Sequence, residues 1–87
     1  MSGHKSSFRA EKKLEAVEIP AGGTAKVDVD VPGVRSGDFS FVAAPCDLQG
    51  LLCSSYAHKN AVTIVLYNPT KGAVSLDAGT WKVKVVR

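Results

Sequence analysis

The chain has 87 residues, 45% of them hydrophobic, and a formal net charge of +3 at neutral pH. This length is enough for one small domain. The longest apolar runs have the length of strands, so the sequence predicts no membrane-spanning helix, and the N-terminus lacks the apolar segment of a secretory signal peptide. Two cysteines, Cys46 and Cys53, are too few for a disulfide framework, and we expect them to be free, half-buried thiols.

Residues 1–13 carry all of the excess positive charge, because the acidic and basic residues of 14–87 cancel. This segment has too little apolar content to pack a core, so it is predicted to be a basic, extended N-terminal arm. We expect the arm to be the docking element, with Phe8 as an aromatic anchor that has no core to join. Its predicted partner-binding residues are Lys5, Phe8, Arg9, Lys12 and Lys13. The alternative is a solubilising leader that binds nothing.

Residues 14–87 are predicted to form one β domain. Short apolar or alternating segments are separated by Gly-, Pro- and Asn-containing turns at regular spacing, which favours a sandwich or a barrel. The expected strands cover 16–19, 24–31, 38–43, 51–57, 61–68, 73–76 and 80–86. The fold class is therefore all-β, a small antiparallel β-sandwich or jelly-roll-like domain that follows the arm.

The segment 61–68 is uncharged and rich in β-branched residues, so it is predicted to be the central strand, covered on both faces and paired antiparallel with 51–57. Strand 80–86 alternates cleanly and should place Lys82 and Lys84 outside. In 51–57, Leu52 and Tyr56 are expected to reach the core. The remaining residues predicted to lie inside are Val27, Val29, Phe39, Phe41, Ile64, Leu66, Trp81, Val83 and Val85.

The residues that carry chemistry form no catalytic or metal-binding pattern. Asp28 and Asp30 are two apart on the wet face of a predicted strand, as ordinary surface charges are. Ser54, Ser55 and His58 lie close in sequence but lack the glycine-flanked turn of a nucleophilic serine. The cysteines and histidines lack metal-ligand spacing. We therefore expect a protein that is not an enzyme and that uses no cofactor or metal.

Nucleic-acid binding is the lesser alternative. The arm has the cations to contact phosphates. The predicted body, however, lacks the interleaved aromatic residues and basic groove of an oligonucleotide-binding sheet. A core built from so few residues is marginal, so we expect the protein to form a homo-oligomer or to dock on a partner.

Short motifs punctuate the predicted strands from Gly22 to Val86. They are Ser36-Gly37-Asp38, Ala44-Pro45, Gln49-Gly50-Leu51, Asn60-Ala61-Val62-Thr63-Ile64 and Asp77-Ala78-Gly79-Thr80-Trp81. In this pattern the chain resembles small β domains of tailed-bacteriophage virion proteins. The arm and the two cysteines lie outside the resemblance.

The resemblance implies a structural role without catalysis. The expected function is that of a capsid decoration (cement) protein that binds the outer capsid surface and stabilises the head. The implied partners are the major capsid protein, other virion subunits and further copies of the chain, with a trimer as one option. The implied location is the virion, after assembly in the host cytoplasm, with no membrane partner. A tail or fibre accessory protein is the other role that the resemblance allows.

Overall fold

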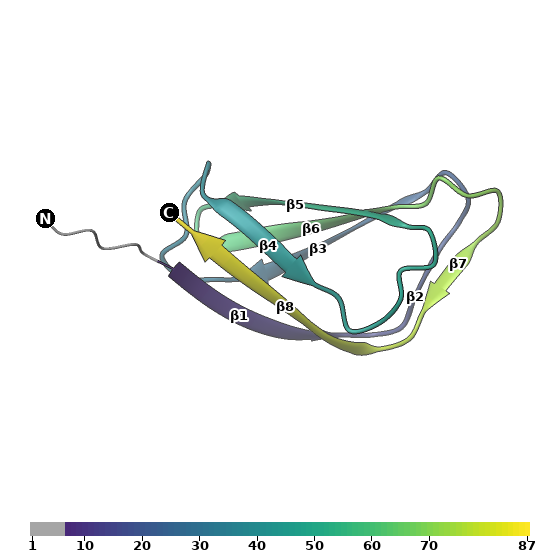
Figure 1. Cartoon of the computed structure of the whole chain (residues 1–87), viewed down its shortest axis with the longest axis horizontal. Coiled ribbons are helices and arrows are strands. Elements are labelled where there is room, and N and C mark those ends of the chain that lie inside the picture. Colours follow the sequence, from purple (N-terminus) through teal and green to yellow (C-terminus); the bar gives the residue numbers. More distant parts are fainter. Residues whose placement is uncertain (1–6) are drawn as a thin grey trace, which may run out of the picture.

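The computed structural model describes residues 7–87, which contain eight strands and no helix. The strands are β1 (Ser7–Leu14), β2 (Val17–Ile19), β3 (Thr24–Asp30), β4 (Phe39–Ala43), β5 (Leu52–His58), β6 (Ala61–Tyr67), β7 (Val74–Leu76) and β8 (Gly79–Val86). Six of them form two antiparallel three-stranded sheets, ordered β1-β8-β4 and β3-β6-β5, while β2 pairs with β7 at one end (Figure 1). The predicted all-β, antiparallel sandwich is confirmed.

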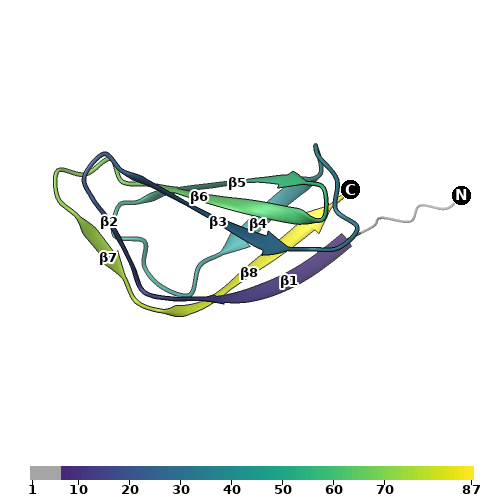
Figure 2. The ribbon, with the colours of Figure 1, turned by 180° about the vertical axis from the view of Figure 1, so that it is seen from behind.

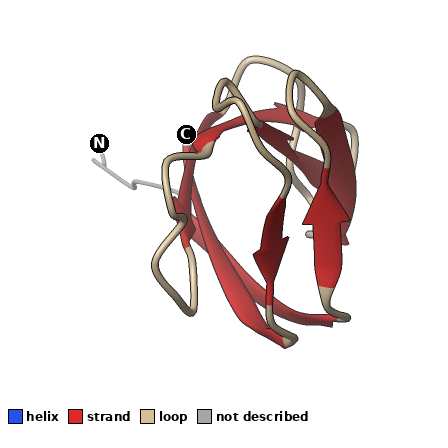
Figure 3. Cartoon of the chain, turned by 90° about the vertical axis from the view of Figure 1, so that its right-hand side faces the viewer, coloured by secondary structure: helices blue, strands red, loops and turns tan. Residues whose placement is uncertain are grey.

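The two sheets are the layers of the sandwich. The β3-β6-β5 sheet lies in front in the view from behind, and the view along the long axis separates it from the β1-β8-β4 sheet (Figures 2 and 3). The core lies between the two sheets and consists of the alternate residues that point inward from each sheet. Its largest fully buried apolar side chains are Ile19, Val29, Val31, Val34, Val62, Ile64, Leu66 and Val85.

Strand β6 is the central strand of its sheet, as predicted. It pairs antiparallel with β3 on one side and β5 on the other. Val62, Ile64 and Leu66 point into the core and are buried. The outward residue Thr63 is also buried, because the side chains of the two neighbouring strands cover it.

The prediction of an arm over 1–13 is wrong for its described part. Residues 7–14 form β1, which pairs with β8 along its whole length, and Phe8, Ala10 and Leu14 pack against the core. The domain therefore includes residues from 7 onward and does not begin at 14. The charged composition of this segment indicates an arm, but charged residues are also common on edge strands such as β1. The partner strand β8 lies far away in the sequence, so a local pattern does not reveal the pairing. Residues 1–6 lie outside the described part of the chain.

The inward and outward residues of β4 are the reverse of the prediction. Phe39 and Phe41 are 69% and 58% exposed. Ser40 and Val42 point inward, because they pair with the buried Val85 and Val83 of β8, and paired residues share a face. Both phases of this short strand contain apolar residues, so only the register with β8 decides which face is buried.

The predicted phase of β5 is wrong for the same reason. Leu52 and Tyr56 are exposed, and Ala57 is buried. Ser55 faces the interior of the sandwich, where its Oγ lies 2.7 Å from Oγ of Ser40. This hydrogen bond joins β4 to β5 across the side of the sandwich on which both strands form sheet edges.

Candidate docking face

The outer face of the β1-β8-β4 sheet gathers basic side chains. The register aligns Arg9, Lys84 and Phe41 in one row across three strands, and Glu11 and Lys82 in the next. Lys13 follows on the same side of β1, since residues two apart share a face of a strand. The face therefore carries four basic groups and one acidic group, a net charge of +3. We call this surface the docking face.

Exposed aromatic rings lie along one border of the docking face. Phe39 and Phe41 are among the most exposed of the large apolar side chains that the structure describes. Beside Phe41 the sheet surface is hollowed over about 350 Å³, between β1 and β4 and across Lys82 and Lys84 of β8. A flat face with a shallow hollow, aromatic rings and cations has the composition of a recognition surface.

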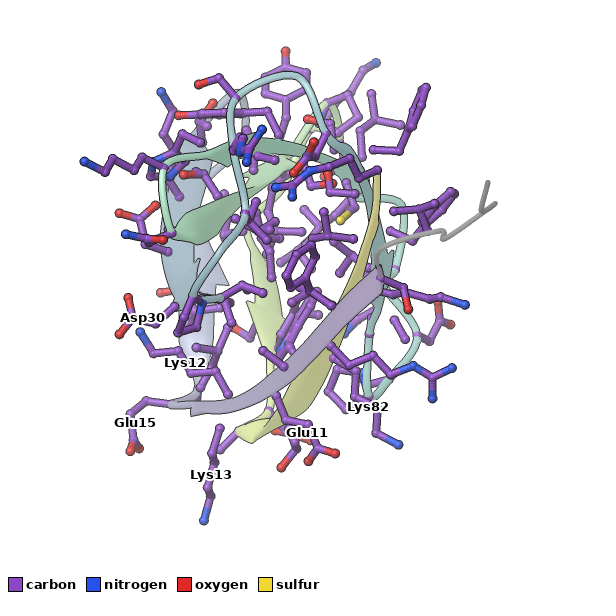
Figure 4. The ribbon with its side chains drawn as sticks, turned by 90° about the vertical axis from the view of Figure 1, so that its left-hand side faces the viewer. Glu11, Lys12, Lys13, Glu15, Asp30 and Lys82 are labelled. Carbon is purple, nitrogen blue, oxygen red and sulfur yellow. The ribbon has the colours of Figure 1, made fainter. Side chains whose placement is uncertain are left out.

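The outer face of the other sheet has the opposite balance. Lys26, Asp28 and Asp30 of β3 lie there together with His58 of β5, which gives a net charge of −1 with the histidine neutral. The excess positive charge of the domain is thus concentrated on the docking face. Figure 4 shows Glu11 and Lys82 together on one side of β1, and Lys12 on the other side, toward Asp30.

The structure divides the predicted partner-binding residues into two groups. Arg9 and Lys13 lie on the docking face. Lys12 lies on the opposite side of β1 and donates a hydrogen bond from Nζ to the carbonyl oxygen of Asp28, 2.9 Å away, which ties the edges of the two sheets together. Lys5 lies outside the described residues.

Phe8, the predicted anchor, is half-buried in the molecule itself. Its ring lies against Gly33, where a Cβ would stand 2.9 Å from the ring, so no larger residue fits without a shift. Gly33 also has a φ of 93°, a backbone conformation that favours glycine. The guanidinium of Arg87 lies 5.2 Å from the centre of the Phe8 ring, within the range of a cation–π interaction. Phe8 therefore serves the fold.

Thr63, His58 and Asp28 form a hydrogen-bonded cluster that superficially resembles a catalytic triad but has a structural role on the outer face of the sheet. The Thr63 hydroxyl donates to Oδ1 of Asp28 and lies 2.8 Å from Nε2 of His58. In a catalytic triad the histidine stands between the nucleophile and the carboxylate, whereas here the hydroxyl stands in the middle and Thr63 is 3% exposed. The three side chains thus cover the outer face of β6.

The two cysteines are free, and both are exposed, although the sequence predicted them to be half-buried. Although Cys53 as a whole residue is exposed, neighbouring groups partly desolvate its sulfur atom, which raises the pKa of Cys53. A raised pKa keeps this sulfur in the protonated form, which is a poor nucleophile. Cys53 therefore lacks the electronic character of a reactive cysteine.

The sequence supplied some members of the docking face and hid others. The predicted outward positions of Lys82 and Lys84 are confirmed, but a local sequence pattern does not link them to Arg9, which lies beside Lys84 because β1 pairs with β8. The sequence predicts Phe39 and Phe41 to lie in the core, whereas both are exposed. The statement that the body lacks aromatic residues interleaved with basic ones is therefore wrong. This face can be predicted only when two facts are known, the phase of β4 and the pairing of β1 with β8.

Comparison with known proteins found no matching family model, no similar curated protein and no similar solved structure. None of the described residues forms a helix that is long and apolar enough to cross a membrane. Within residues 7–87 no group of three or more acidic, histidine or cysteine side chains is placed to hold a metal ion.

Proposed function

We propose that this protein is a non-enzymatic structural component of a virion, a capsid decoration subunit that binds an acidic patch on the major capsid protein or on another virion subunit. The observation that carries the proposal is the docking face, where Phe39 and Phe41 lie beside a row of exposed basic residues. The resemblance of residues 22–86 to phage virion domains suggests the kind of partner.

The two kinds of side chain on the docking face have complementary effects on binding. Aromatic rings that become buried at the centre of an interface commonly supply most of its binding energy. Cations around them attract an acidic surface, raise the association rate and make binding sensitive to salt. A sheet face is also rigid, so the protein loses little conformational freedom when it docks.

The first experiment asks whether the protein belongs to the particle. Mature virions of the virus that encodes this chain are purified and analysed by quantitative mass spectrometry. We expect the chain in a fixed ratio to the major capsid protein. Its absence from intact particles would overturn the proposal.

The second experiment asks whether the docking face makes the contact. Lys82→Glu with Lys84→Glu reverses two charges on the face, and Lys26→Glu with Lys71→Glu makes the same change of net charge elsewhere on the surface. We expect the first pair to weaken binding to particles that lack the protein by at least about tenfold, and the second pair to have little effect. Equal losses from both pairs would mean that net charge alone governs binding.

Single-stranded nucleic acid is the second candidate partner, and one observation favours it. Phe41 stands in a cross-strand row with Lys84 and Arg9, which is how stacking platforms combine a ring for a base with cations for the phosphates. Fluorescence anisotropy with labelled oligothymidylate tests this function. Binding that falls steeply with salt and is lost in Phe41→Ala would support it. No binding at about 50 mM salt, where phosphate contacts are strong, would exclude it.

A further inference from the structure

The four edge strands of the two sheets differ sharply in charge. Strands β1 and β3, on one side of the sandwich, contain four and three charged residues. Strands β4 and β5, on the other side, contain no Asp, Glu, Lys or Arg. Proteins commonly place charges on edge strands to prevent pairing with another chain. The side formed by β4 and β5 lacks this protection.

Strand β4 is also accessible as an edge. Within the described chain, no residue from 39 to 43 makes a backbone hydrogen bond outside the ladder with β8. A hollow of about 530 Å³ opens along the seam between β4 and β5, so the described segments do not cover this edge. The outward backbone groups of β4 are therefore available to another strand.

We propose that β4 pairs antiparallel with β4 of a second copy of this chain and joins the two β1-β8-β4 sheets into one six-stranded sheet. A two-fold axis perpendicular to the sheet keeps the docking faces of both copies on the same side. The register that pairs all five residues of β4 places Phe41 opposite Phe41 of the second copy, and Phe39 opposite Ala43. An aromatic pair directly opposite across two strands stabilises such a ladder.

The same construction is less favourable for β5. Full antiparallel self-pairing of Leu52–His58 would place Ser55 opposite itself and Leu52 opposite His58. No aromatic or aliphatic pair forms on the exposed face in that register. Both edges lack charge, but only β4 presents apolar side chains that match their own copies.

The charges near β4 do not oppose the pairing. Asp38, directly before the strand, is held by Arg87 of its own chain at 3.0 Å. The basic residues of β8 lie one strand further from the axis. In the joined sheet the two β8 strands would be about 14 Å apart, beyond the Debye length of about 8 Å at physiological ionic strength.

The available area predicts a weak dimer. The two Phe rings of each copy, at 69% and 58% exposure, offer at most about 500 Å² of aromatic surface in a dimer. Specific stable interfaces bury roughly 1,200–2,000 Å² in total. We therefore expect association in the range of tens to hundreds of micromolar, which sedimentation experiments at high protein concentration reach.

The inference concerns the purified chain alone and holds whether or not the proposed function is correct. Sedimentation equilibrium from about 5 to 500 μM should show a monomer–dimer equilibrium for the parent protein. Phe41→Lys should weaken dimerisation by at least about tenfold, because it buries a charge beside its own copy. Leu52→Lys is the matched control, since Leu52 is 59% exposed on the β5 edge. Circular dichroism confirms that each variant is folded.

Three outcomes would overturn the inference. The first is a parent protein that stays monomeric over the whole range. The second is dimerisation that Leu52→Lys abolishes and Phe41→Lys leaves intact, which would place the interface on β5. The third is equal weakening by both substitutions, which would indicate non-specific association.

A cysteine cross-link tests the register. In a Cys46→Ser, Cys53→Ser background, Phe41→Cys places the thiols of the two copies opposite each other across the proposed two-fold axis. Oxidised glutathione should convert this variant to a disulfide-linked dimer and be reduced in the process. The conversion should be much faster than that of the matched Leu52→Cys variant. Cross-linking of Phe41→Cys that is no faster than that of Leu52→Cys would exclude the proposed register.

Discussion

Asp38 and Arg87 form the charge pair that closes the end of the sandwich near Phe8. Nη2 of Arg87 donates to Oδ2 of Asp38 at 3.0 Å and to the carbonyl oxygen of Gly33 at 2.7 Å. The hydrogen bond from Arg87 is the main reason that the pKa of Asp38 lies below its ordinary value, and the backbone N–H of Arg35 adds to the effect. One side chain thus connects the loop before β4 to the residue after β8.

This lowered pKa makes part of the stability depend on pH. A carboxylate whose pKa is lower in the folded state stabilises that state fully above the unfolded value, near about 3.9, and loses the contribution as the pH falls through the folded pKa. Asp38→Asn should therefore lower the free energy of unfolding at pH 7, and its difference from the parent should shrink between about pH 4 and pH 2. Urea unfolding at several pH values measures the difference in the free energy of unfolding between the variant and the parent. Asp77→Asn, an exposed carboxylate, is the control, and a pH-independent difference for Asp38→Asn would contradict the explanation.

Asn68 organises the turn after β6. It is fully buried, and its Nδ2 donates to the carbonyl oxygens of Ile19 and Gly72 at 2.8 and 2.9 Å. Its Oδ1 accepts hydrogen bonds from the backbone N–H and the hydroxyl of Thr70. A single side chain therefore satisfies backbone groups from β2 and from the turn, which explains why this residue is polar at a position without exposure.

Asn68→Ala should be among the most destabilising single changes in the protein. It leaves the buried carbonyl oxygen of Ile19 and the partly buried backbone N–H of Thr70 without these partners, at about 1–3 kcal/mol for each one that water does not reach. Thr70→Val removes only the hydroxyl, which lies within hydrogen-bonding distance of Oδ1 of Asn68 and of the carbonyl oxygen of Gly72, and should cost about 1 kcal/mol. Urea denaturation midpoints compare the two variants. A loss for Asn68→Ala no larger than that for Thr70→Val would mean that the turn is held by its backbone alone.

At the scale of elements, the sequence predicts a strand and its buried face well where the pattern of apolar residues allows only one interpretation. Strands β3 and β8 alternate apolar and polar residues, and β6 is apolar on both faces, so periodicity and composition were sufficient. Strands β4 and β5 have apolar residues in both phases, and their phase depends on pairing with β8 and β6. Such non-local information is not present in a short window of sequence. The docking face was hidden for the same reason.

Strand β1 shows how a tertiary contact overrides composition. Its charges resemble those of a disordered tail, yet Phe8, Ala10 and Leu14 recur at every second or fourth position and pack on the core. The sequence of β1 does not reveal its partner strand β8, which lies far away in the chain and pairs with β1 along its whole length. Alternation in a charged N-terminal segment is thus an indication of an edge strand that composition alone conceals.

Deletion of residues 1–13 should therefore unfold the protein or cause it to aggregate. The deletion exposes the edge of β8 and removes apolar side chains from the core, in a domain whose total stability is on the order of 5–15 kcal/mol. Deletion of residues 1–6 leaves the β1–β8 ladder intact and should preserve the unfolding transition. Circular dichroism melting of both truncated proteins makes the comparison. A cooperative transition at the parent Tm after deletion of residues 1–13 would show that β1 is dispensable.

At the scale of the whole molecule, charge and apolar exposure are distributed over different surfaces. The docking face carries the net positive charge, the opposite sheet face is slightly acidic, and the uncharged edges lie together on one side. Face docking uses the exposed side chains of the sheet, whereas edge pairing uses the backbone groups of β4 together with Phe41, a side chain that both contacts share. Two copies joined through β4 would present four Phe rings flanked by two basic rows, which gives a partner a larger continuous surface.

A dimer that forms only from folded chains makes stability depend on concentration. Mass action stabilises the folded state once the protein concentration exceeds the dissociation constant. For a domain of this size 1 kcal/mol corresponds to about 4–8 °C in Tm. The Tm of the parent protein should therefore rise by several degrees between about 5 and 500 μM, whereas the Tm of Phe41→Lys should stay constant. Differential scanning calorimetry at both concentrations makes the measurement, with Leu52→Lys expected to follow the parent. An equal rise for Phe41→Lys would show that the stabilising contact lies elsewhere than β4.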